Sequence, residues 1–163
     1  MTSVRRRLLI PIASLALVLL ARPALADATA FIGASPTPTS RQARGFAVGF
    51  GMAVLGFEFE YSSILQDAQQ GAPSVQTGMG NVLLQTPTAI LGFQPYITAG
   101  AGVYHEALGA ATETNFGLNT GGGVKLSLVG PLKLRVDYRI FTLAGSALQP
   151  HPQRIYAGLT LSF

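Results

Sequence analysis

The sequence predicts an all-β fold, an eight-stranded antiparallel up-and-down transmembrane β-barrel, and three observations predict it. Several segments alternate apolar and polar residues with a period of two, which places the two sets on opposite faces of a strand. The connections between the candidate strands alternate between long and short, as in barrels whose N- and C-termini lie on the same side of the membrane. The chain ends on an aromatic residue, Phe163, where a soluble sheet usually ends in polar, frayed residues.

The first 26 residues have the pattern of a secretory signal peptide. Arg5 to Arg7 precede an apolar run from Leu8 to Leu20, and Ala24-Leu25-Ala26 supplies the small residues that a signal peptidase requires. The alternative is an uncleaved anchor, but the apolar run is short for a span of about 20 residues. We therefore expect export by the secretion machinery and cleavage after Ala26, with residues 1–26 as the signal and residues 27–163 as one barrel domain.

Removal of this segment changes the charge of the protein. Four of the eleven Lys and Arg residues lie in it, so seven remain against seven Asp and Glu, and the formal net charge falls from +4 to zero. This balance gives no reason to expect a nucleic-acid partner. The chain has no Cys, which excludes a lipoprotein anchor and disulfides.

Two segments show the strand period most clearly. From Leu55 to Ser62 and from Leu132 to Ile140 every second residue is apolar, and a helix would scatter these residues around its circumference. Extending this pattern along the chain predicts eight strands, an even number as bacterial single-chain barrels require. The strands are expected at about 28–35, 44–53, 55–64, 75–86, 93–106, 114–128, 132–143 and 153–163.

The predicted connections fall into two groups. The long ones, rich in polar residues, Pro and Gly, are expected on the outer side of the membrane, and the short ones on the periplasmic side. The glycine-rich segments at 100–102 and 121–123 lack the Lys-Ser/Thr ending of a phosphate-binding loop. We interpret them as strand glycines that make room for large neighbours in a narrow interior. The long connections are 36–40, 66–73, 107–113 and 144–152; the tight ones lie near Val54 and at 129–131, and 87–92 is intermediate.

The second half of the chain resembles a known family. The segments Pro95 to Gly102, Gly117 to Val124 and Leu132 to Arg139 are similar to the last strands of small outer-membrane β-barrel proteins, including the barrel half of outer-membrane protein A. The resemblance implies a monomer in the bacterial outer membrane, in contact with outer-membrane lipid. We expect no cell-wall-anchoring domain after Phe163.

The terminal strand carries a second resemblance. Tyr156, Gly158, Leu161 and Phe163 look like the signal by which the barrel assembly machinery recognises its clients, with a Gly, an apolar residue and a terminal aromatic at fixed spacing. This implies the assembly machinery as a partner during biogenesis.

The polar faces of the strands define a candidate site. They place charged side chains inside a barrel whose interior is just wide enough for side chains to fill it. We expect these charges to pair into a polar core, with Glu58 and Glu60 facing Arg135, Arg139 or Lys133, because an unpaired ion in a confined site costs several kcal/mol. The alternative is a narrow ion path through the same network. The predicted cluster consists of Glu58, Glu60, Lys125, Lys133, Arg135, Asp137 and Arg139.

Enzymatic and soluble alternatives stay open but are not favoured. His105, beside Glu106, and His151, between Pro150 and Pro152, are expected near the outer rim, yet no Ser lies in a nucleophile motif and neither His belongs to a His-x-Ser pair. Ser146, Glu113 and Asp67 are expected at the same rim. The sequence also lacks the His-x-x-x-His or Asp-rich spacing that would indicate a metal site. Although some small barrels modify lipids, we therefore expect no catalytic residues, no metal and no cofactor. A soluble ligand-binding barrel would place the apolar faces inside instead.

Overall fold

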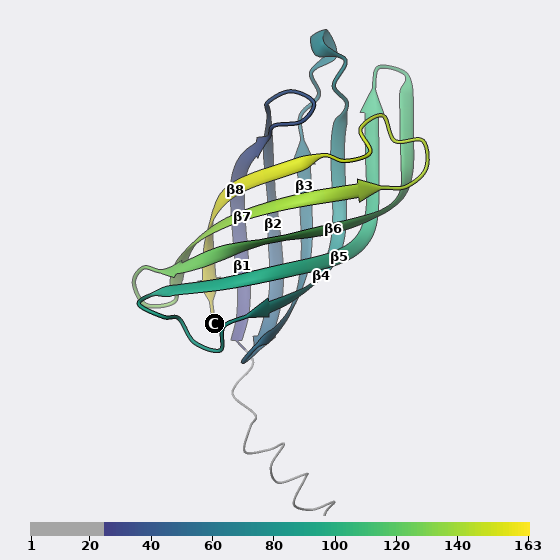
Figure 1. The fold of residues 1–163 in the computed structure, drawn as a ribbon. Helices are drawn as coiled ribbons and strands as arrows, with labels where there is room; N and C mark the ends of the chain where they lie inside the picture. The colour runs from purple at the N-terminus through teal and green to yellow at the C-terminus, as the bar shows by residue number, and fades with distance from the viewer. Residues whose placement is uncertain (1–24) are drawn as a thin grey trace, which may run out of the picture.

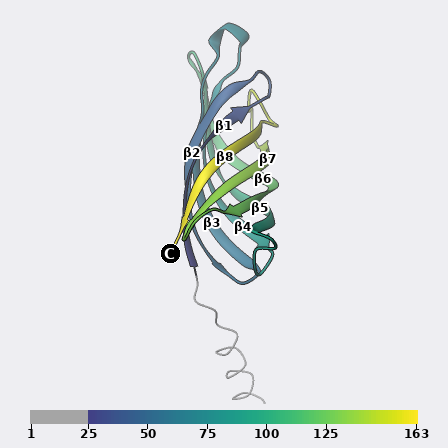
Figure 2. The same ribbon diagram turned by 90° about the vertical axis from the view of Figure 1, so that its left-hand side faces the viewer.

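A computed structural model describes residues 25–163 as one closed barrel of eight antiparallel strands. Each strand pairs with its neighbours in sequence, and β1 pairs with β8 to close the sheet (Figures 1 and 2). The predicted fold class is therefore confirmed. The strands are β1 (Leu25–Ser35), β2 (Arg41–Met52), β3 (Leu55–Ile64), β4 (Ser74–Gln85), β5 (Phe93–Leu108), β6 (Ala111–Ser127), β7 (Leu132–Leu143) and β8 (Gln153–Ser162).

The outer surface of the barrel is apolar. On β3, Phe57 and Phe59 point outward and are exposed, whereas Glu58 and Glu60 between them are buried inside. The faces predicted for β7 and β8 agree with the structure in the same way. A barrel that is apolar outside and charged inside is an outer-membrane protein, because lipid is the solvent that suits such an exterior and closure leaves no backbone edge unpaired in lipid. The exposed apolar side chains include Ile32, Phe46, Val48, Phe50, Leu55, Val82, Leu84, Ile97, Val103, Phe116, Leu118, Val136, Tyr138, Ile155, Leu159 and Leu161.

The two ends of the barrel differ. The start of β1 and the C-terminus lie at one end together with the connections β2–β3, β4–β5 and β6–β7, and the connections β1–β2, β3–β4, β5–β6 and β7–β8 lie at the other (Figure 1). We call the end with the start of β1 and the C-terminus the periplasmic end and the opposite end the outer end. The β3–β4 connection contains the only helical turn among the described residues, the 3-10 helix η1 (Ala68–Gln70). No helix in the described part of the chain is long and apolar enough to cross a membrane.

One predicted loop is wrong. Residues 107–113 are not a long connection, because β5 continues to Leu108 and β6 begins at Ala111. Gly109 has a φ of 60°, which allows the chain to reverse within two residues. The flanking residues then pair across the hairpin, and Thr114 hydrogen-bonds to His105 over 2.7 Å. The β5–β6 hairpin therefore extends at the outer end as a long two-stranded ribbon (Figure 1).

The predicted signal peptide lies outside the described residues except for its last two positions. Leu25 and Ala26 form the beginning of β1, and Ala26 exchanges two backbone hydrogen bonds of 2.8 Å with Phe163. Cleavage after Ala26 would start the mature chain at Asp27, whose partner on β8 is Ser162. The barrel seam keeps its remaining pairs from Asp27 to Ala34 in either case.

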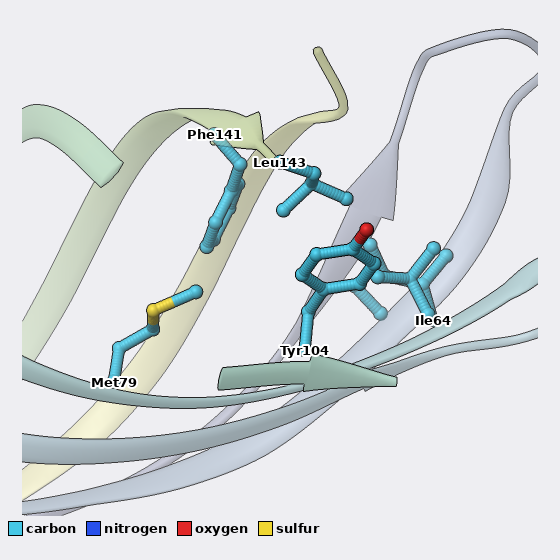
Figure 3. Packing of buried hydrophobic residues seen from close by; sticks show 7 residues of the cluster. Ile64, Met79, Tyr104, Phe141 and Leu143 are labelled. Atoms are coloured by element: carbon cyan, nitrogen blue, oxygen red, sulfur yellow. The ribbon is translucent and has the colours of Figure 1, made fainter. Parts of the chain in front are cut away.

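An apolar layer fills the outer part of the lumen. Met79, Tyr104, Phe141 and Leu143 point inward from β4, β5 and β7 and pack against Ile64 of β3 (Figure 3). All of them are 5% exposed or less. The tyrosine hydroxyl donates a hydrogen bond of 2.5 Å to the carbonyl of Ala144, so the layer also holds the start of the β7–β8 connection.

Candidate functional site

The centre of the lumen holds a network of ion pairs between opposite walls. Glu58 of β3 accepts hydrogen bonds from Arg135 and from Arg139 of β7, the latter over 2.9 Å. Since β3 and β7 are four strands apart in a ring of eight, these pairs cross the full width of the barrel. The three side chains are almost completely buried. Charge-assisted hydrogen bonds of this kind tie the two walls together.

Asp137 and Tyr96 complete this central tier. Asp137 lies between the two arginines on β7 and accepts from Arg139 Nε over 3.0 Å and from Arg135 over 3.2 Å. The hydroxyl of Tyr96 donates to Asp137 and accepts from Arg135 Nε over 2.7 Å. The guanidinium of Arg135 also lies 4.9 Å from the centre of the Tyr96 ring. Each charge in the tier therefore has several partners, which offsets the cost of removing it from water.

A second tier lies toward the outer end. Glu60 accepts from Arg154 of β8 over 2.5 Å and lies 3.3 Å from Arg139. The guanidinium of Arg154 is surrounded by three aromatic rings, with ring centres 5.1 to 5.2 Å away. Such contacts favour a buried cation by about 2 kcal/mol when water is excluded. The rings belong to Phe31, Phe141 and Tyr156.

A third tier lies at the periplasmic end. Lys125 of β6 forms an ion pair of 2.6 Å with Asp27 of β1, and Ser162 donates to the same carboxylate over 2.6 Å. Lys133 of β7 is only half-buried and forms no ion pair with any residue from 25 to 163. The structure thus brings the predicted residues into the lumen but joins only six of the seven into ion pairs.

Arg154, Asp27 and Tyr96 belong to the network although the sequence did not single them out as members. Arg154 and Tyr156 lie on the same, inward face of the terminal strand. The alternation of residues in this strand could therefore have predicted that Arg154 points into the lumen. The same period places Asp27 on the inward face of β1 with Thr29 and Ser35, but nothing in the sequence indicates its partner Lys125, which lies 98 residues away. Across the three tiers, four carboxylates pair with four cationic side chains, so the paired charges cancel.

The residues of the predicted assembly signal divide between the two faces of β8. Tyr156 points inward and stacks on Phe31, with ring centres 4.0 Å apart, and Gly158 lies beside this pair. A Cβ at Gly158 would come within 2.8 Å of Phe31, so this position requires glycine. Leu161 and Phe163 point outward and are 47% and 70% exposed.

The acidic residues near the outer rim accept hydrogen bonds from backbone amides. Glu106 is fully buried and accepts hydrogen bonds from the amides of Leu148 and Gln149, over 2.6 and 3.1 Å. Glu113 accepts from the amide of Ser146 over 3.4 Å, and Asp67 caps η1 by accepting from Gln70 over 3.3 Å. These carboxylates therefore hold the outer connections in place.

The two histidines lie apart from these acids. His105 points outward from β5, and its Nδ1 is 2.7 Å from the hydroxyl of Thr114. His151 is exposed in the β7–β8 connection. No group of three metal-ligating side chains occurs within residues 25–163. In the described part of the chain no carboxylate is hydrogen-bonded to His105, so the His105–Thr114 pair lacks the third group that orients a catalytic base.

Solved structures share this fold. Neisserial surface protein A matches with a TM-score of 0.65 and 18% identity, over 86% of this chain and 96% of that protein. The N-terminal β-barrel domain of Pseudomonas aeruginosa OprF matches with a TM-score of 0.64 and 14% identity, over 85% of this chain and 97% of that domain. The outer-membrane enzyme PagL matches with a TM-score of 0.53 and 16% identity, over 83% of this chain and 98% of that protein.

The chain has the fold of small outer-membrane barrels. At these identities the likeness concerns the fold alone, and the fold is shared by an enzyme, so it does not decide whether this barrel is catalytic. No protein-family model matches the sequence, and no curated protein matches it.

Proposed function

We propose that this barrel is a structural component of the outer membrane whose outer end serves as an interaction surface, with a sealed lumen and no catalysis. The observation that carries the proposal is the filling of the lumen. Two tiers of paired charges and an apolar layer fill it from its centre to the outer end, and the third tier lies beside the periplasmic mouth. An ion moving through would have to separate buried pairs and cross the apolar layer, and each step costs several kcal/mol.

The outer end has the rigidity that a recognition surface requires. Arg41 of β2 donates to the carbonyls of Thr37, Leu65 and Pro73, so one side chain joins the β1–β2 and β3–β4 connections. Glu106 and Glu113 fasten the β7–β8 connection to the β5–β6 hairpin in the same way. Loops that are held before binding lose less conformational entropy when a partner docks.

The lumen leads to a conductance prediction. The purified barrel in a planar lipid bilayer should give no unitary current steps, because an ion can cross the network only by separating buried ion pairs. Reproducible steps whose size changes when Arg139 is replaced by Ala would instead support the narrow ion path. Current that is insensitive to this change would come from leakage around the protein.

The outer surface leads to a cell-binding prediction. Leu148 is 50% exposed and His151 is exposed, while the backbone amide of Leu148 binds Glu106. The double variant Leu148→Ser/His151→Ser keeps that amide and changes only the exposed groups. In a strain lacking the gene, the variant should restore resistance to large antibiotics as well as the wild type does but adhere several-fold less to epithelial cells.

A matched control lies at the opposite end. Leu91, in the β4–β5 connection at the periplasmic end, is 94% exposed, so Leu91→Ser removes a similar apolar group without touching the outer surface. Equal adhesion of all three strains would contradict the interaction role. Failure of the wild type to restore resistance would contradict the structural role.

A lipid-modifying activity receives less support. PagL shows that an enzyme can have this fold. However, no carboxylate among residues 25–163 is hydrogen-bonded to His105, and Glu106 and Glu113 use their carboxylates to hold backbone amides. A general base normally needs an oriented partner within hydrogen-bond reach.

We further propose that the chain is exported through its signal, residues 1–26, and is inserted as a monomer by the barrel assembly machinery. The closed ring supports the monomer, because every strand has two neighbours and no edge is left for a second copy. The outward position of Leu161 and Phe163 supports recognition of the terminal strand from the lipid side.

A further inference from the structure

The lumen opens at the periplasmic end into a cavity of about 270 Å³. Its floor is the central ion network, since Glu58 lines it, and its walls come from strands around the barrel. On β2 and β3 the lining residues Gly49, Gly51 and Gly56 have no side chains to occupy the space. One water takes about 30 Å³ in the liquid, so the cavity has room for a group of several non-hydrogen atoms.

Both lysines of the whole sequence line this cavity. Lys125 is only 5% exposed, and its single hydrogen bond goes to Asp27. An ammonium has three donors, so two remain. Lys133 is half-buried and has neither a hydrogen bond nor an ion pair with residues 25–163. The cavity thus presents ammonium donors that the described protein groups leave unused.

The carboxylates of the cavity already have donors. Both oxygens of Glu58 accept from the arginines on β7. The two oxygens of Asp27 accept from Lys125 and from Ser162. Because the charges of the three tiers cancel, Lys133 adds one positive charge that has no ion-pair partner among residues 25–163.

We propose that this cavity binds a small oxyanion, a carboxylate or a phosphate group that enters from the periplasm, with the ammonium groups of Lys125 and Lys133 as its ligands. Hydrogen bonds between an ammonium and such an anion are charge-assisted and roughly twice as strong as neutral ones. Gln85 and Gln94 line the same cavity. The amide of Gln94 already donates to the carbonyl of Thr86 over 2.9 Å, so the amide of Gln85 is the one suited to the neutral part of a ligand. The central network closes the far side, so the ligand leaves through the mouth by which it entered.

The two lysine side chains also provide the signals by which anion binding can be measured. Barrel purified from outer membranes with ¹³C-labelled lysine gives two lysine side-chain signals, which Lys133→Gln assigns. Inorganic phosphate and acetate, titrated in a zwitterionic detergent at constant ionic strength, should each shift both signals with a saturable curve. A lower Kd for phosphate than for acetate identifies a phosphate-bearing ligand, and the reverse order a carboxylate-bearing one. Glycerol, a neutral probe, should shift neither signal.

Variants separate the cavity from general anion binding. Lys133→Gln should weaken binding at the Lys125 signal at least tenfold, and Lys133→Arg should retain it. Arg44→Gln removes an exposed cation from the other end and the outer face of the barrel, so it should leave the Kd unchanged. Unchanged heat-modifiable gel mobility shows that each variant is folded. Linear shifts without saturation, or equal weakening by Lys133→Gln and Arg44→Gln, would overturn the proposal.

Discussion

Replacing Glu58 by Ala should lower the free energy of unfolding of the barrel by about 3 to 5 kcal/mol, as is typical when one partner of a buried ion pair is removed. The change leaves Arg135 without its partner on the opposite wall and removes one of the carboxylates of Arg139. Asp137 remains, but it then faces two buried cations alone at this tier. Urea unfolding in detergent micelles measures the difference.

The control for this prediction is an acid at the surface. Asp67 makes one exposed hydrogen bond, of 3.3 Å, to the amide of Gln70 at the 3-10 helix of the β3–β4 connection. Asp67→Ala should therefore cost about 1 kcal/mol or less, as the loss of an exposed helix cap does. Glu58→Gln, which keeps the shape but not the charge, should lie between the two. Equal losses for Glu58→Ala and Asp67→Ala would show that the network does not stabilise the barrel.

Deletion of Phe163 should reduce insertion into the outer membrane several-fold while export and signal cleavage continue. The side chain is 70% exposed on the lipid side, so it contributes little to packing within the barrel. Its backbone pairs with Ala26, a partner that is lost if the signal is removed after that residue. The deleted chain should then refold in detergent with nearly the stability of the intact chain. The fractions of mature protein in membrane and periplasm, with heat-modifiable mobility, measure the effect.

A conservative change one residue earlier provides the control. Ser162 donates to Asp27 at the periplasmic end of the lumen, and Ser162→Thr keeps this hydroxyl and raises β propensity. Its insertion should match that of the wild type. If the Phe163 deletion inserts at the wild-type rate, the similarity of the terminal strand to an assembly signal is a coincidence. If the deletion also fails to refold in detergent, the residue acts on stability and not on recognition.

The arrangement of the lumen explains why these two expected effects are separate. The network lies inside and joins walls that meet only in the folded barrel, so Glu58 acts on stability. The terminal aromatic lies outside, where it is exposed to lipid and to the assembly machinery that we propose as its partner. Tyr156 belongs to both sets of residues, because it matches the predicted assembly signal yet packs inside against Phe31.

Local pattern determined much of the fold. The alternation in β3, β7 and β8 predicted which side chains point inward, because a strand turns every second residue to the same face whatever its neighbours are. The number of strands followed from extending this alternation along the chain, and the alternation of long and short connections indicated the up-and-down arrangement. The connection at 107–113 was wrongly predicted to be a long loop, because Gly109, Thr112 and Glu113 indicate a loop until the pairing of β6 with β5 is known.

What only the tertiary structure decided is which inward charges meet. Sequence alternation gives a face but not a height or a partner across the barrel. Those depend on strand tilt and on the register between neighbours, which are set only when β1 pairs with β8. Closure brings Asp27 to Lys125, Arg154 to Glu60 and Glu58 to the two arginines of β7. It also leaves Lys133 at the periplasmic mouth without an ion pair among the described residues, because the carboxylates that line the same cavity, Asp27 and Glu58, are paired with Lys125 and with the arginines of β7.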